Sequence, residues 1–124
     1  MRILLDTHVL LWLLAQPSRL PPGTRKRIAT ADAYVSAASI WEIGIKARLG
    51  KLRADADEIL SSIEPAGFTL LSVSGEHAAR VTHLPPLHRD PFDRMLVAQC
   101  LVEPMILVTN DVALTGYGPF VTLA

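Results

Sequence analysis

The chain has 124 residues, and its twelve Lys and Arg balance its twelve Asp and Glu, so the formal net charge is zero. Half of the residues are apolar and only 19% are charged, a composition that excludes intrinsic disorder. A neutral chain also lacks the global positive field of a protein that coats nucleic acid, and the length fits one domain, residues 1–124.

Short apolar runs alternate with helical patterns along the chain. The predicted strands are residues 3–5, 33–36, 68–73, 105–109 and 120–123. The predicted helices are residues 7–16, 23–31, 37–49, 55–66, 74–82 and 91–102, with a loop at 17–22 and a helical turn after Asn110. Apolar strands that alternate with helices predict an α/β fold of three layers, α/β/α, with a central parallel sheet in a single domain.

The only cysteine, Cys100, lies in an apolar run and is predicted to be a buried side chain rather than a reactive thiol. Asp6 interrupts the apolar N-terminus, and no leader pattern for export follows. The longest early apolar run, 9–15, is too short to span a membrane. We therefore expect a cytoplasmic protein with no membrane association, and the apolar excess suggests that a partner covers part of its surface.

Four acidic residues fall near the carboxyl ends of the predicted strands. Asp6 follows the first strand and Asp111 the fourth, while Glu42 and Asp93 lie near the starts of two helices. Right-handed crossovers bring these positions to one edge of the sheet, where such folds bind ligands. Clustered carboxylates repel one another, and Mg²⁺ or Mn²⁺ is the ion that suits oxygen ligands. The pattern predicts metal-assisted hydrolysis of phosphodiester bonds.

Each acid also has a purely structural interpretation, because acids favour helix N-termini. These are a cap at Asp6, a capping box at Ser39 and Glu42, a cap at Asp90 followed by Asp93 in the first turn, and a cap at Asp111. If capping is their only role, the protein is a non-catalytic α/β binding module. A phospho-aspartyl receiver-like domain is a further alternative, but it requires two adjacent acids after the first strand and a late Lys, which this chain lacks.

Other polar residues could reach the same edge. His8 and His88 could act as ligands or acids there, although hydrogen bonding within their loops is the simpler role. A basic rim beside these acids could track phosphates, with a solvated helix face as the alternative; its best-placed members are Lys46, Arg48, Arg89 and Arg94. We expect His77 and His83 to lie on helix surfaces, and Trp12 and Trp41 to lie in the core or in an interface.

Four stretches of the sequence closely resemble a PIN-domain protein, and more narrowly a VapC-type toxin. The most specific of them is His88 to Gln99, and the others are 6–12, 39–43 and 107–111. The resemblance spans essentially the whole chain and implies a PIN-like domain. Four residues match the family's acids and would be both catalytic and metal-binding: Asp6, Glu42, Asp93 and Asp111.

The activity that this resemblance implies is that of a Mg²⁺- or Mn²⁺-dependent endoribonuclease toxin of a type II toxin–antitoxin pair. Such enzymes hydrolyse RNA with metal-activated water and leave 3′-hydroxyl and 5′-phosphate ends. Members commonly form homodimers. A cognate VapB-type antitoxin blocks the site, and operator DNA is bound only through that antitoxin.

The chain departs from the family pattern at three places. Many relatives carry Ser or Asn where this chain has His8, which leaves the hydrogen bonds that support Asp6 unassigned. Asp90 competes with Asp93 for the third acidic position, and the apolar helix that follows favours Asp93. No second acid follows Asp111, so a second metal ion would have few ligands.

Overall fold

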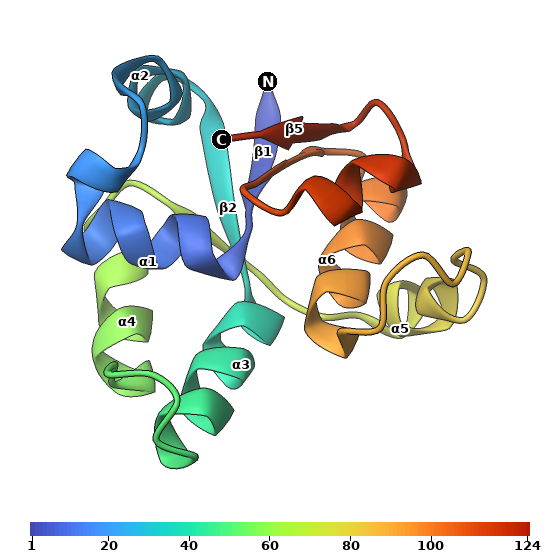
Figure 1. The fold of residues 1–124 in the computed structure, drawn as a ribbon, viewed down its shortest axis with the longest axis horizontal. Coiled ribbons are helices and arrows are strands. Elements are labelled where there is room, and N and C mark those ends of the chain that lie inside the picture. Colours follow the sequence, from blue (N-terminus) through green and yellow to red (C-terminus); the bar gives the residue numbers. More distant parts are fainter.

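The computed structural model describes all 124 residues and contains a sheet of five parallel strands in the order β3-β2-β1-β4-β5 (Figure 1). The strands are β1 (Arg2–Leu5), β2 (Asp32–Ser36), β3 (Thr69–Leu71), β4 (Ile106–Thr109) and β5 (Val121–Leu123). All five predicted strands are confirmed, although β3 is shorter than predicted.

Six α-helices and two short 3₁₀ helices connect the strands. The α-helices are α1 (Thr7–Ala15), α2 (Pro22–Thr30), α3 (Ala37–Arg48), α4 (Ala56–Ile63), α5 (Gly75–Val81) and α6 (Pro91–Val102). One 3₁₀ helix, Pro17–Arg19, lies in the predicted loop, and the other, Val112–Tyr117, follows β4. No helix is long and apolar enough to cross a membrane.

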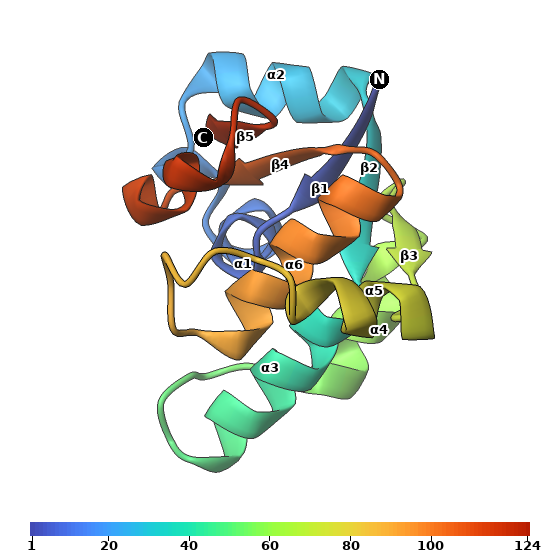
Figure 2. The same ribbon diagram turned by 90° about the vertical axis from the view of Figure 1, so that its right-hand side faces the viewer.

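Helices cover both faces of the sheet because successive strand residues point to opposite sides. Ile3 and Leu5 pack on one side with residues of α1 to α4, whereas Leu4 packs on the other with residues of α6 and the second 3₁₀ helix. Figure 2 shows the sheet from the side of α5 and α6. The two cores confirm the predicted three-layer α/β/α architecture.

The order of the strands reverses beside β1. From β1 the chain builds β2 and then β3 on one side, and later returns to place β4 on the other side. The register pairs Leu5 with Val108, so the next residues, Asp6 and Thr109, lie side by side at the carboxyl edge of the sheet. This switch point is where open α/β sheets bind ligands.

The prediction for His77 is wrong, and the prediction for Trp41 keeps only one of its two alternatives. His77 is 2% exposed instead of lying on the surface, because it completes a capping box with Ser74 and its Nε2 lies 2.5 Å from Glu103 Oε2. Trp41 is 67% exposed and therefore lies outside the core of the chain. Its ring meets Phe92 edge to face, with centroids 5.2 Å apart; a place in an interface stays a prediction.

Candidate metal centre

Asp6 stands at the carboxyl end of the central strand and is 3% exposed. Its Oδ1 accepts a hydrogen bond of 2.9 Å from the backbone N–H of His8, so Asp6 does cap α1 as one interpretation predicted. Its Oδ2 accepts a hydrogen bond from the hydroxyl of Thr109. Each carboxylate oxygen has a second lone pair, so the cap leaves Asp6 able to bind a further ligand.

Thr109 is a residue of the site that the sequence analysis missed. It is fully buried, and besides donating to Asp6 it accepts a hydrogen bond of 3.1 Å from the backbone N–H of Asp111. It thus supplies the support for Asp6 that the exposed His8 ring, with Nδ1 4.0 Å from Asp6 Oδ1, does not give. The sequence feature that could have indicated this role is a hydroxyl residue at the end of a buried strand. In the sheet register, Thr109 follows Val108, which pairs with Leu5, the residue before Asp6.

Glu42 lies in the second turn of α3 and is 2% exposed. Its Oε2 lies 2.5 Å from the ammonium of Lys46, whereas its Oε1 is buried with no hydrogen-bond partner. The predicted capping box is wrong, because α3 begins at Ala37 with Ser36 as its cap and Ser39 lies inside the helix. A buried carboxylate oxygen without a partner carries a desolvation cost, and a cation would offset that cost.

Asp93 faces the same centre from the first turn of α6. The cap of that helix is Asp90, whose Oδ1 accepts from the backbone N–H groups of Phe92 and Asp93. Burial raises the pKa of Asp93 to about 7, and repulsion by the charges of Asp6, Asp90 and Glu42 adds to the effect. Burial also raises the pKa of Asp6, with a smaller contribution from Glu42.

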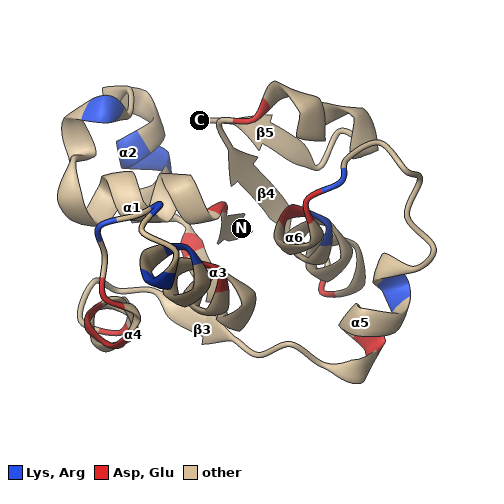
Figure 3. Cartoon of the chain, turned by 60° about the horizontal axis from the view of Figure 1, so that its bottom comes forward, with Lys and Arg blue, Asp and Glu red and all other residues tan.

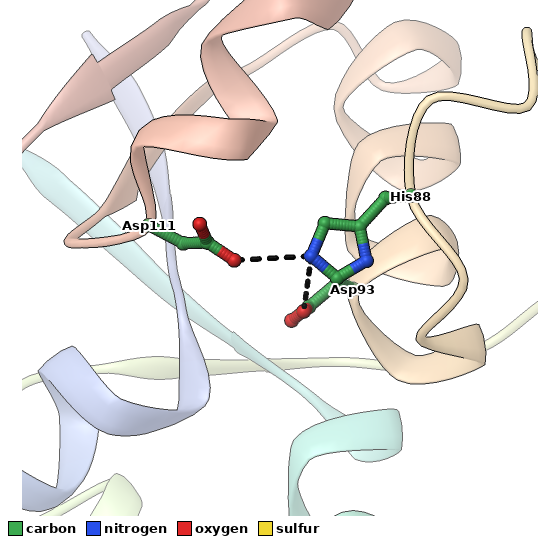
Figure 4. Close-up of side chains that lie close together, drawn as sticks. All are labelled: His88, Asp93 and Asp111. Carbon is green, nitrogen blue, oxygen red and sulfur yellow. Dashed lines mark hydrogen bonds and ion pairs between the residues drawn. The ribbon is translucent and has the colours of Figure 1, made fainter.

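Asp111 joins this group through His88 (Figure 4). His88 Nε2 lies 3.0 Å from Asp111 Oδ2 and 3.5 Å from Asp93 Oδ2. The other oxygen of Asp111 accepts from the backbone N–H of Ala113 and caps the second 3₁₀ helix. The predicted caps at Asp90 and Asp111 therefore exist, and Asp111 faces His88 and Asp93 at the same time.

The four predicted acids thus come together at the switch point between β1 and β4. Figure 3 shows acidic residues on α3 and α6 where these helices face each other. The donor set consists of carboxylate oxygens, which suit Mg²⁺ or Mn²⁺, and the unpartnered Oε1 of Glu42 is an atom that such a cation would satisfy. The residues present therefore fit a divalent cation.

The basic residues beside this centre make two different kinds of contact. Lys46 lies with Lys51 in a pocket of about 220 Å³ that also includes Glu42, and its hydrogen bond to Glu42 raises the pKa of its ammonium. Arg94, in contrast, donates to the carbonyls of Val81, Pro85 and His88 and to the hydroxyl of Tyr117. The prediction that Arg94 belongs to a phosphate-binding rim is wrong, because its donors hold the protein's own loop.

Comparison with known proteins agrees with this architecture. A model of the PIN domain matches residues 3–117. A ribonuclease, VapC22 of Mycobacterium tuberculosis (strain ATCC 25618 / H37Rv), is 30% identical over 113 residues, which cover 88% of this chain and 86% of the relative.

Solved structures share the fold at lower identity. VapBC2 from Rickettsia felis, bound to a promoter DNA fragment, superposes with a TM-score of 0.71 at 15% identity, covering 100% of this chain and 98% of that chain. DNA-bound VapBC from Salmonella typhimurium gives a TM-score of 0.70 at 16% identity, covering 100% and 97%. Because the family model matches nearly the whole chain and the VapC22 relative is similar over most of both lengths, this chain belongs to the PIN domain family and is a relative of VapC ribonucleases.

Proposed function

We propose that the protein is a Mg²⁺- or Mn²⁺-dependent endoribonuclease in which Asp6, Glu42, Asp93 and Asp111 bind the metal. The observation that carries this proposal is the unpartnered, buried Oε1 of Glu42 in a centre where burial and mutual repulsion already raise the pKa of Asp93. The relationship to a VapC ribonuclease supports RNA as the substrate.

The chain's own residues have separate tasks in this hydrolysis. A bound divalent cation would supply an activated water and neutralise charge that develops on the phosphate oxygens. Thr109 fixes the orientation of Asp6 through the hydrogen bond to Oδ2. Lys46 occupies Oε2 of Glu42 and leaves Oε1 available. These contacts preorganise the carboxylates before substrate arrives, which is how a protein lowers the cost of reaching the transition state.

A pair of matched substitutions tests the proposal. We expect Asp6→Asn to abolish Mn²⁺-dependent cleavage of RNA and to leave the fold intact, because it removes one charge from a repulsive group. Asp90→Asn is the control, since Asp90 lies next to the centre but acts as the cap of α6, and asparagine also caps helices. Cleavage that survives in Asp6→Asn, or that is lost only in Asp90→Asn, would contradict the assignment.

The chemistry of the new ends is tested on the same digests. Hydrolysis by activated water is expected to leave 3′-hydroxyl and 5′-phosphate ends, so the fragments should accept a ligated adaptor at the 5′ end without prior phosphorylation. A 2′,3′-cyclic phosphate would show instead that the RNA's own 2′-hydroxyl is the nucleophile. Chelation of the metal should stop cleavage, and Mg²⁺ or Mn²⁺ should restore it.

The biological role proposed here is that of the toxin in a toxin–antitoxin pair. Similar folds occur in VapBC complexes, two of them bound to DNA, which supports a VapB-type antitoxin as the partner and operator DNA as a target reached through that partner. We also propose that the protein acts as a homodimer in the cytoplasm. Expression alone should arrest growth, and co-expression of a small protein encoded beside it should relieve the arrest and co-purify with the chain.

A further inference from the structure

The side chain of His88 has hydrogen-bond partners at both ring nitrogens, and together they fix where its proton lies. Nδ1 lies 3.1 Å from the backbone nitrogen of Asp90. A backbone N–H only donates, so Nδ1 accepts this bond and carries no hydrogen. The hydrogen of the neutral imidazole is therefore on Nε2.

This assignment makes Nε2 a donor toward the acidic centre. It lies 3.0 Å from Asp111 Oδ2 and 3.5 Å from Asp93 Oδ2, so the shorter bond goes to Asp111 (Figure 4). We infer that His88 is a positioning residue that holds Asp111 in the centre through its Nε2–H and that it is not itself a metal ligand. This inference rests on the proposed function, because it assumes that Asp111 is needed there.

One ligand atom from each of His88, Asp93 and Asp111 lies within 4.8 Å of the other two, close enough to surround a cation. A ligand nitrogen needs a free lone pair, however, and Nε2 would gain one only if the proton moved to Nδ1. A proton on Nδ1 would face the N–H of Asp90 and break the bond that fixes the start of α6. The geometry therefore favours His88 as a hydrogen-bond donor to a carboxylate rather than as a ligand of the cation.

Asp111 is the acid that most needs such support. The Asp111 side chain is 39% exposed, compared with 4% for Asp6 and 3% for Glu42. Its backbone is placed by Thr109, but its Oδ2 has no other hydrogen bond from the protein than that of His88. Outer residues that orient ligating side chains typically contribute 10–100-fold to metal affinity or activity.

Two substitutions separate the roles of the two nitrogens. His88→Gln can place an amide N–H near the position of Nε2, whereas His88→Asn can place an oxygen near the position of Nδ1. If the contact with Asp111 matters, Mn²⁺ affinity measured by calorimetry should stay within a few fold of wild type in His88→Gln. It should fall about 10–100-fold in His88→Asn and His88→Ala.

The opposite order would overturn the inference. If His88 served only to fix the loop before α6, His88→Asn would retain Mn²⁺ affinity and His88→Gln would lose it. If His88 were a ligand, His88→Gln would lose affinity together with His88→Ala. His83→Asn is the control, because His83 is an exposed histidine from the same loop region, and thermal unfolding of each variant verifies that it is folded.

A second measurement needs neither metal nor RNA. Nitrogen-15 NMR of the metal-free protein should show His88 with its proton on Nε2 and an unprotonated Nδ1, and a proton on Nδ1 would overturn the inference. This readout also separates the two proposals. A protein with the expected tautomer and Mn²⁺ affinities that does not cut RNA would contradict the proposed function and leave the positioning role intact.

Discussion

The carboxyl group of Asp93 carries the strongest electrostatic perturbation among the acids of the centre. Burial and three neighbouring acids raise its pKa to about 7, well above the usual value of about 3.9 for an unfolded chain. Its charged form is therefore disfavoured in the folded protein without metal. Negative charge concentrated in this way costs stability, and the proposed cation would offset that cost.

The pH dependence of stability follows from that shift in the pKa of Asp93. Between about pH 4 and pH 7 the folded chain holds a proton that the unfolded chain has lost, so the free energy of unfolding of the metal-free protein should fall as the pH rises. We expect a loss on the order of 1–3 kcal/mol over this window, measured by urea denaturation in the presence of a chelator.

Asp93→Asn provides the control for this prediction, because it removes the titrating group and keeps the shape. The variant should lose most of the slope between pH 4 and pH 7 and should be more stable than wild type at pH 8 without metal. A wild-type protein whose stability rises with pH through this window would contradict the assignment of the raised pKa to Asp93.

At the scale of elements, the loop between α5 and α6 is held by one side chain. Arg94 extends from α6 to carbonyl groups of α5 and of the loop, and to the hydroxyl of Tyr117 in the second 3₁₀ helix. One guanidinium thus ties together three segments: the end of α5, the loop that follows it and the second 3₁₀ helix. The same loop carries His88, so its order also sets the geometry of the centre.

We expect Arg94→Met to lower stability by about 1–3 kcal/mol, because the carbonyls lose a charged donor while the apolar stem of the side chain is kept. Thermal unfolding should show a decrease of several degrees. Arg48→Met is the matched control, since Arg48 is exposed at the end of α3 and makes no hydrogen bond or salt bridge within the protein. Equal unfolding temperatures for the two variants would show that Arg94 does not hold the loop.

The elements themselves could be predicted well because their signals are local. Apolar strands, a proline at the start of α6 and glycines after α3 and α4 mark most boundaries to within a few residues. The contacts inside the centre could not be predicted in this way. The hydrogen bond between Thr109 and Asp6 joins residues 103 positions apart. The hydrogen bonds by which Arg94 holds the loop depend on where α5 ends. Such partners are fixed by the sheet register and by packing, which periodicity does not report.

At the scale of the whole molecule, a net charge of zero conceals two opposed regions. Without Asp6, Glu42, Asp93 and Asp111, twelve basic residues face eight acidic ones (twelve minus four), which leaves a charge of +4 outside the centre and −4 within it. Figure 3 shows basic residues on α2, on α3 and in the loop that follows α3. In the metal-free protein the acidic centre should therefore repel RNA that the basic surface attracts.

Because the acidic centre and the basic surface have opposite effects on RNA, the removal of one negative charge from the centre should change the affinity for RNA. In a chelating buffer at low salt and about pH 8, where most Asp93 side chains of the wild type carry a charge, the Asp93→Asn variant should bind a short fluorescent RNA several-fold more tightly than wild type, as measured by polarisation. The difference should shrink as salt increases, because screening weakens interactions between charges. A difference that persists at high salt would show that the substitution changes the shape of the site rather than its field.

The position of β4 has a consequence for the timing of synthesis. β4 pairs with the central strand β1 on the side opposite β2, yet its residues 106–109 are made long after residues 2–5 of β1. Thr109 and Asp111 reach the centre only when that strand takes its place. A chain that has been synthesised only as far as α6 therefore lacks two of the side chains that meet at the centre, and the proposed site stays incomplete until β4 pairs with β1.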